Sequence, residues 1–299
     1  MCVSDRVDLL DQTAEVQPKA ERDAEGGSRC LRPPIVVTVN PFHVCVHVDC
    51  GEASVVNMGV QPVRANWIPL DGGVEVRVDE WGEIFEERIA LTDLEKALKN
   101  LAANNARARS KFRRYCKSNR LRKMWVLTYE SQTLDRKQIQ NDMNGFMNRW
   151  RLFNGGELFP YAYVLELHES REGYHVHVAV PLGYMDKHVL QKMWGHGLVW
   201  FSDKKAPPRT SARKQSEILA AYLAKYLDKS FNDECRAPGE HRYEVAQGFD
   251  PDQVRREFPT MKDAREWLAK YQGESFVEVW CSDDKEEWDG RPVWLFSSG

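Results

Sequence analysis

Three side chains near the middle of the chain could together bind a metal ion: Glu166, His175 and His177. The segments YAYVLELH (161–168) and YHVHVAV (174–180) alternate apolar and polar residues, which predicts two strands of a β-hairpin. With a four-residue loop between them, Glu166 faces His175 and Val164 faces His177. A carboxylate and two imidazoles on one face can bind a divalent cation and leave coordination positions open.

The alternative is that these histidines are ordinary solvent-facing residues of an amphipathic strand. Three potential ligands from both strands favour the metal site. His168 shares their face but lies at the hairpin end, so it is left out of the predicted ligand set.

A second cluster lies on a predicted helix, SEILAAYLAKYLDKS (216–230). Tyr222 and Tyr226 are four residues apart and share a face with Lys225, whereas three leucines supply an apolar face. A tyrosine can act as a covalent nucleophile, but its phenol needs help to lose its proton, because the ordinary pKa is about 10. Lys225 could lower that pKa or hold a phosphate. The alternative is a buried tyrosine whose hydroxyl is hydrogen-bonded for structural reasons.

A run of basic residues without any acid precedes these elements. Its members are Arg107, Arg109, Lys111, Arg113, Arg114, Lys117, Arg120, Arg122 and Lys123. A basic loop at 203–214 adds Lys204, Lys205, Arg209 and Arg213. Cations at this density favour contact with a nucleic-acid backbone, since each neutralised phosphate releases counterions. The alternative is a solvated helix face, although such faces usually mix charges of both signs.

Several further elements are predicted around these clusters. We expect a helix that begins at Thr92-Asp93 with Leu94, Leu98 and Leu101 on one face, and another from Arg136 to Phe153 whose apolar stripe is core. The remaining predictions are strands in 35–48 broken at Asn40-Pro41, at 74–78, at 125–130 and at 275–280, and a helix that begins near Thr260.

Composition and length narrow the class of protein. The chain has 299 residues with 42% hydrophobic content, and its net charge of -3 hides the local basic run. The seven cysteines show no C-x₂-C spacing, so reduced thiols are expected. No secretory signal and no apolar run of about 18 residues is found, so a cytoplasmic protein without membrane contact is expected. The predicted parts are a disordered tail at 1–32, a β-rich extension at 33–100, a catalytic domain at 101–240 and a C-terminal extension at 241–299.

The ordered set of motifs resembles the HUH endonuclease superfamily, and more narrowly the rolling-circle replication initiators of small phages and plasmids. HVHV at 175–178 and YLAKY at 222–226 match the superfamily pattern fully, and WVLTYE at 125–130 matches it loosely. The match covers about 125–230. It implies an α+β fold: a central antiparallel β-sheet, related to ferredoxin and RRM folds, with flanking helices packed mainly on one side.

The resemblance also implies a mechanism. His175 and His177 would hold Mg²⁺ or Mn²⁺ with Glu166 as third ligand, and Tyr222 would attack the scissile phosphate. The products would be a 5′-phosphotyrosine link and a free 3′-OH, with Tyr226 as a possible second nucleophile. The expected partner is single-stranded DNA at a replication origin. Host helicase and polymerase would be needed in a bacterial cytoplasm, because the chain has no phosphate-loop motif.

Three alternatives stay open at this point. A relaxase or a tyrosine transposase of the same superfamily would share the chemistry. A DNA- or RNA-binding regulator with an accidental histidine pair would bind without metal or covalent adduct. A metal phosphoesterase of the histidine-triad type is disfavoured, because Ala179 stands where a third histidine would be expected.

Overall fold

A computed structural model describes most of the chain from residue 40 onward. The described residues are 40–60, 67–78, 81–168, 170, 172–181, 186–202, 207–231, 241–273, 275–285, 288 and 290–298. The predicted tail at 1–32, the part of the first predicted strand before residue 40, and Lys204 and Lys205 lie outside them. Helices and antiparallel sheets make up the described part, so the predicted α+β class is confirmed.

The predicted hairpin forms the centre of a five-stranded sheet, here called the histidine sheet. Its strands are all antiparallel neighbours and follow the order β10 (Tyr243–Val245), β7 (Ala162–Leu167), β8 (Tyr174–Val180), β6 (Lys123–Leu127) and β9 (Val199–Phe201). Strand β8 is buried along nearly its whole length, which is typical of a strand covered on both faces.

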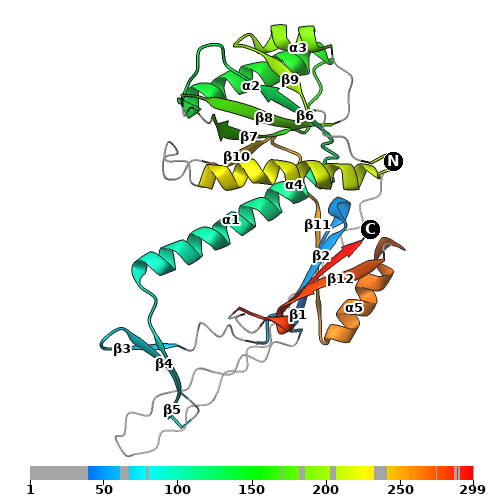
Figure 1. Cartoon of the computed structure of the whole chain (residues 1–299). Helices are drawn as coiled ribbons and strands as arrows, with labels where there is room; N and C mark the ends of the chain where they lie inside the picture. Colours follow the sequence, from blue (N-terminus) through cyan, green and yellow to red (C-terminus); the bar gives the residue numbers. More distant parts are fainter. Residues whose placement is uncertain are drawn as a thin grey trace, which may run out of the picture. The chain divides into compact units, whose positions relative to one another are not determined.

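Helices cover both faces of the histidine sheet, so the expectation of helices mainly on one side is wrong (Figure 1). One face packs against α2 (Arg136–Phe153) and α3 (Lys187–Trp194), and the other against α1 (Asp93–Ser118) and α4 (Ala212–Phe231). The physical reason is that the strands carry apolar residues at both parities. Leu165 and Val176 point into the first core, whereas Val164 and Ala179 point into the second.

The helix ends follow the predicted capping signals. Thr92 caps α1 in a reciprocal capping box with Glu95, and α2 has the predicted bounds with Asp135 as its cap. The predicted leucines at the start of α1, Leu94 and Leu98, are exposed rather than packed. None of the helices in the described part is long and apolar enough to cross a membrane.

A second five-stranded antiparallel sheet, here called the Glu52 sheet, draws strands from both ends of the chain. Its order is β11 (Gln253–Phe258), β1 (Phe42–His47), β2 (Glu52–Asn57), β13 (Val293–Ser298) and β12 (Phe276–Cys281). Helix α5 (Met261–Lys270), capped by Thr260 as predicted, packs on it. The two segments that the sequence analysis treated as separate extensions thus contribute to one sheet, and residues 243–245 join the histidine sheet instead.

Three short strands form a separate antiparallel sheet: β3 (Ile68–Leu70), β4 (Val74–Val78) and β5 (Ile84–Ile89). Single-turn helices complete the described part: η1 (Val48–Cys50), η3 (Tyr271–Gly273) and η4 (Ser282–Asp284). The predicted strand at 74–78 is confirmed with its bounds.

The connection from α3 to β9 passes very close to the end of β6. The backbone N–H of Thr128 donates to the carbonyl of Leu198 at 3.0 Å, and the indole of Trp194 donates to the Thr128 carbonyl at 2.8 Å. A Cβ on Gly197 would collide with that same Thr128 carbonyl oxygen. Only a glycine therefore allows β9 to approach β6 in this way.

Candidate active site

The hairpin register places the predicted metal ligands on one face, as expected. Glu166 pairs with His175 and Val164 pairs with His177 across β7 and β8, and the amide of His168 donates to the carbonyl of Gly173 at 2.9 Å. Directly opposed residues of antiparallel strands project to the same face. That face is the one covered by α1 and α4, because Val164 belongs to the core beneath them.

Glu166 and His177 are joined by a hydrogen bond. The Nε2 atom of His177 lies 2.8 Å from Oε2 of Glu166, and the two side chains are 17% exposed for the glutamate and 5% exposed for the histidine. The other ring nitrogen of His177, Nδ1, is buried and has no hydrogen-bond partner among the described residues. A buried polar atom in that condition is unfavourable unless a ligand or a rearrangement satisfies it.

His175 is half-buried beside the same carboxylate. Burial lowers the pKa of its imidazole, and the neighbouring His168 and His177 lower it further against the opposing charge of Glu166. The ring of His168 lies 4.9 Å from that of His175. A lowered pKa keeps His175 neutral near pH 7, which is the form that can coordinate a metal.

Helix α4 brings both predicted tyrosines to this face. The ring of Tyr226 stacks on His177 with centroids 4.0 Å apart and planes at 15°, and the hydroxyls of Tyr226 and Tyr222 are 2.7 Å apart. Leu219, Leu223 and Leu227 fix this orientation because they are buried in the core beneath the sheet. The arrangement brings the phenols and the imidazole into one continuous cluster.

Burial raises the pKa of the Tyr226 phenol, and its hydrogen bond with Tyr222 and the charges of Tyr222 and Glu166 raise it further. Lys225 is exposed on α4, with Nζ 5.7 Å from the centroid of the Tyr222 ring. A positive charge near the carboxylate would be needed to ease the ionisation of Tyr226.

Metal-binding geometry is incomplete in this structure. Across the described residues, no three side chains of His, Cys, Asp or Glu form a group that could hold a metal ion. Glu166 and His177 are bonded to each other instead of pointing to a common centre. The donor types nevertheless fit a divalent cation, and the unsatisfied Nδ1 atom gives His177 a free coordinating nitrogen.

Part of the basic run has a structural partner that the local sequence did not reveal. Glu52 of β2 accepts hydrogen bonds from Arg113 at 3.0 and 3.1 Å, from Arg114 at 3.2 Å and from Lys117 at 2.9 Å. Burial alone would raise the pKa of Glu52, but the bonds and charges of Arg113 and Lys117 outweigh it and lower the pKa to about 2.

The side chain of Lys117 is only 4% exposed, so it cannot reach a DNA phosphate in this conformation. The prediction of DNA contact for Lys117 is therefore corrected, and Arg113 and Arg114 are at least partly engaged by Glu52. The missing signal was an acid 65 residues away, because charge was counted only within the run.

The other predicted cations are spread over several elements. Arg120 donates to the carbonyls of Asp49 and Lys117, and Arg213 donates to the hydroxyl of Ser298 at 3.0 Å. Arg107, Lys111 and Lys123 are exposed. Those in a half-buried setting are Arg109, Arg122 and Arg213, whereas Arg209 lies just before α4. DNA contact for these residues stays a prediction.

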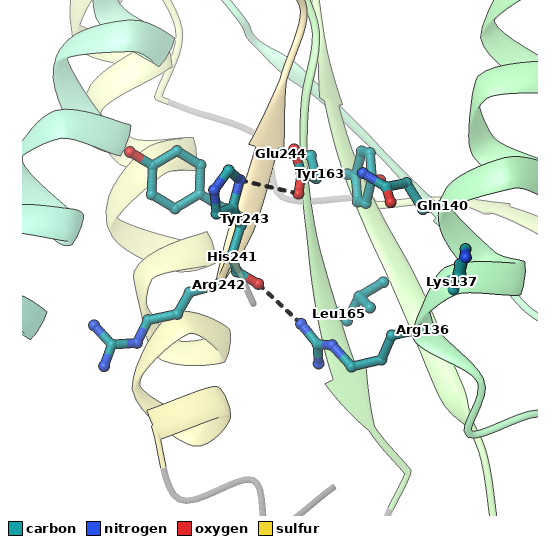
Figure 2. A pocket seen from close by; sticks show the side chains of 9 residues that line it. All are labelled: Arg136, Lys137, Gln140, Tyr163, Leu165, His241, Arg242, Tyr243 and Glu244. Atoms are coloured by element: carbon teal, nitrogen blue, oxygen red, sulfur yellow. Dashed lines mark hydrogen bonds and ion pairs between the residues drawn. The ribbon is translucent and has the colours of Figure 1, made fainter. Parts of the chain in front are cut away.

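A cavity that the sequence did not indicate opens at the other face of the histidine sheet. It measures about 370 Å³ and is lined by Arg136, Lys137, Gln140, Tyr163, Leu165, His241, Arg242, Tyr243 and Glu244 (Figure 2). Tyr163 and Leu165 point into the core under α2, away from the face of Glu166. Arg136 reaches across the edge to the carbonyl of His241 at 3.0 Å, a pair 105 residues apart in the chain.

Comparison with known families adds one finding. Residues 122–231, from the start of β6 to the end of α4, match the model of a family of replication-associated proteins, the ORF2 family. No curated protein and no solved structure was found to match the chain. The matched segment contains the whole cluster of Glu166, His175, His177 and the two tyrosines, so the match supports a DNA-binding role in the initiation of replication.

Proposed function

We propose that the chain initiates rolling-circle replication by nicking single-stranded DNA at an origin. The observation that carries this proposal is the continuous cluster of Glu166, His177, Tyr226 and Tyr222, joined by two hydrogen bonds and a ring stack within the matched segment. An isolated structural tyrosine would not need a second phenol and a histidine–carboxylate pair beside it.

The proposed step is a transesterification. The phenolic oxygen of Tyr222 attacks phosphorus, the bond from phosphorus to the 3′ oxygen breaks, and a 5′-phosphotyrosine link forms. The phenol loses its proton to the surroundings and the departing 3′ oxygen gains one, so no net proton is consumed. The free 3′-OH can then prime synthesis by a host polymerase after a host helicase unwinds the duplex.

The protein's own groups would position the phosphate for this attack. The two tyrosine hydroxyls are 2.7 Å apart, so either one can reach the same phosphate with little movement. Lys225 is exposed on the same helix face and would hold a non-bridging phosphate oxygen. Tyr226 is proposed as the second nucleophile, which would allow the strand to be rejoined at the end of replication.

Glu166, His175 and His177 are the residues that would hold Mg²⁺ or Mn²⁺. When bound, such an ion polarises a phosphate oxygen and offsets negative charge that develops in the transition state. Release of Nε2 of His177 from Glu166 would make both groups available as ligands. Binding of Mn²⁺ to the protein without DNA, followed by calorimetry, would be lost in His175→Ala.

Covalent capture tests the proposal. The full chain is incubated with Mn²⁺ and single-stranded oligonucleotides that tile its own replicon, and the products are separated on a denaturing gel. Wild type should give a band of protein linked to DNA, and Tyr222→Phe should remove it. Tyr129→Phe is the matched control, because that tyrosine bonds Asp142 outside the cluster.

Persistence of the full adduct in Tyr222→Phe but not in Tyr226→Phe would move the nucleophile to Tyr226. Absence of any adduct with every oligonucleotide, together with DNA binding that survives EDTA, would refute the enzyme and favour a non-catalytic binding protein.

A further inference from the structure

One row of side chains runs across the histidine sheet on the face that carries the candidate site. Val164 pairs with His177, His177 pairs with Val126, and Val126 pairs with Trp200. Each pair faces the same way because the strands are antiparallel. Trp200 on the edge strand β9 therefore lies on the same face as His177, two strands away.

The end of this row at β9 is open. Helix α4 packs on β7 at the opposite end, where Val164 is buried. Val126 is only partly buried and Trp200 is 50% exposed. A large indole left in solvent beside a candidate site is informative, because an exposed aromatic group on a sheet face has hydration to lose by stacking on a ligand.

The surroundings of Trp200 are cationic. Nζ of Lys187 lies 4.3 Å from the centroid of the indole ring, as in a cation–π contact. His188 and Lys192, from the same helix α3, line a cavity of about 830 Å³ that also borders Leu198 at the start of β9. An aromatic ring with nearby cations is the combination by which proteins bind a single strand, since bases stack and phosphates pair with the cations.

We propose that Trp200 stacks on a base of the single-stranded DNA that enters the candidate site, with Lys187 on the adjoining phosphate. This inference rests on the proposed function. Adjacent strands are about 4.8 Å apart, so Trp200 and His177 are separated by about 10 Å. That span corresponds to about three nucleotides at the stacked spacing of about 3.4 Å. The stacked base is therefore placed within about three nucleotides of the scissile phosphate.

Binding without chemistry tests the inference. The full chain in EDTA is titrated into two fluorescent strands of equal length, oligo(dT) and a strand of abasic sugar-phosphate units, and anisotropy is measured. Trp200→Ala should weaken oligo(dT) binding about five- to 100-fold, because one stacked base is lost. The abasic strand, which offers phosphates but no bases, should bind wild type and variant alike.

Two further variants make the result specific to the ring. Trp200→Phe should keep most of the affinity for oligo(dT). Phe201→Ala is the matched control, since Phe201 is 41% exposed on the same strand but pairs with Trp125 and faces the other side of the sheet. If Trp200→Ala lowers the thermal midpoint, Trp200→Leu replaces it, because leucine keeps apolar volume without a ring.

The inference is overturned if Trp200→Ala binds oligo(dT) as tightly as wild type, if it loses the abasic strand equally, or if Phe201→Ala shows the same loss. These outcomes are separate from failure of the proposed function. Loss of the covalent adduct in all conditions leaves base-dependent binding at Trp200 intact, and equal binding of the two strands leaves the adduct intact.

Discussion

Two carboxylates on strands of different sheets, Glu52 and Glu166, are surrounded in different ways. Glu52 is held by three cationic side chains of α1, and its pKa is lowered to about 2. Glu166 bonds an imidazole and lies close to two phenols. A carboxylate fixed by permanent cations has its charge already balanced, so it has little left for a ligand. A carboxylate beside a titratable ring can exchange its partner for a metal ion or a phosphate-bound water.

The largest expected effect would break the comparison at Glu52. Glu52→Ala should lower the free energy of unfolding by about 3–5 kcal/mol, because the ammonium of Lys117 would be left buried without its partner. Denaturant unfolding measures this. The control is Glu257→Ala, whose side chain is 57% exposed and pairs with His43. A loss as small as that of the control would show that the Glu52 cluster is not a stabilising unit.

The next effect concerns activity at Glu166. Glu166→Gln should slow formation of the covalent adduct about 100- to 1,000-fold, as for loss of one group that stabilises developing charge. Its unfolding free energy should change by less than about 1 kcal/mol, since glutamine keeps a hydrogen bond to His177. Single-turnover nicking and denaturant unfolding are measured on the same preparation. Equal loss of stability in Glu166→Gln and Glu52→Gln would erase the distinction between the two carboxylates.

Acid should weaken the fold through Glu52. Its folded pKa of about 2 lies below the ordinary value of 4.5, so its contribution is complete above pH 4.5 and is lost as the pH falls toward 2. The expected loss is about 3 kcal/mol. His47 adds a separate loss between pH 6.5 and about 4, because burial and the charge of Arg114 lower its pKa to about 4. The difference between wild type and Glu52→Gln across a pH range of about 2 to 6 isolates the glutamate.

The smallest expected effect separates the two halves of the basic run. Neutral substitutions at the exposed Arg107, Lys111 and Lys123 should each reduce the salt dependence of single-strand binding by about 0.7 in the slope of log K against log salt. Lys262→Gln on α5, exposed and distant in sequence, should leave the slope unchanged. Unchanged slopes in all three variants would assign this run to structure rather than to DNA contact.

Local patterns predicted much of the histidine sheet and little of its surroundings. Alternation across 161–180 gave the register of Glu166 with His175, and capping signals at Thr92 and Asp135 gave two helix starts, because both depend on neighbours within a few residues. Apolar residues at both strand parities indicated cover on both faces, but the resemblance was followed instead.

Long-range pairings were beyond such patterns. The partner of Lys117 is 65 residues away, and the Glu52 sheet joins β1 to β11 across some two hundred residues. Neither contact leaves a local signature. The stack of Tyr226 on His177 needed the orientation of α4 relative to β8, which the leucine face limits but does not determine.

The close passage of β9 over the end of β6 has a consequence for natural variation and for engineering. Position 197 admits no side chain, since a methyl group would meet the Thr128 carbonyl and force the two strands apart. Trp200 is three residues further along and would shift with the displaced strand. An alanine at position 197 is therefore expected to mimic the loss of the indole without touching the ligand, and homologues that retain an aromatic edge should be intolerant of change at this silent neighbour.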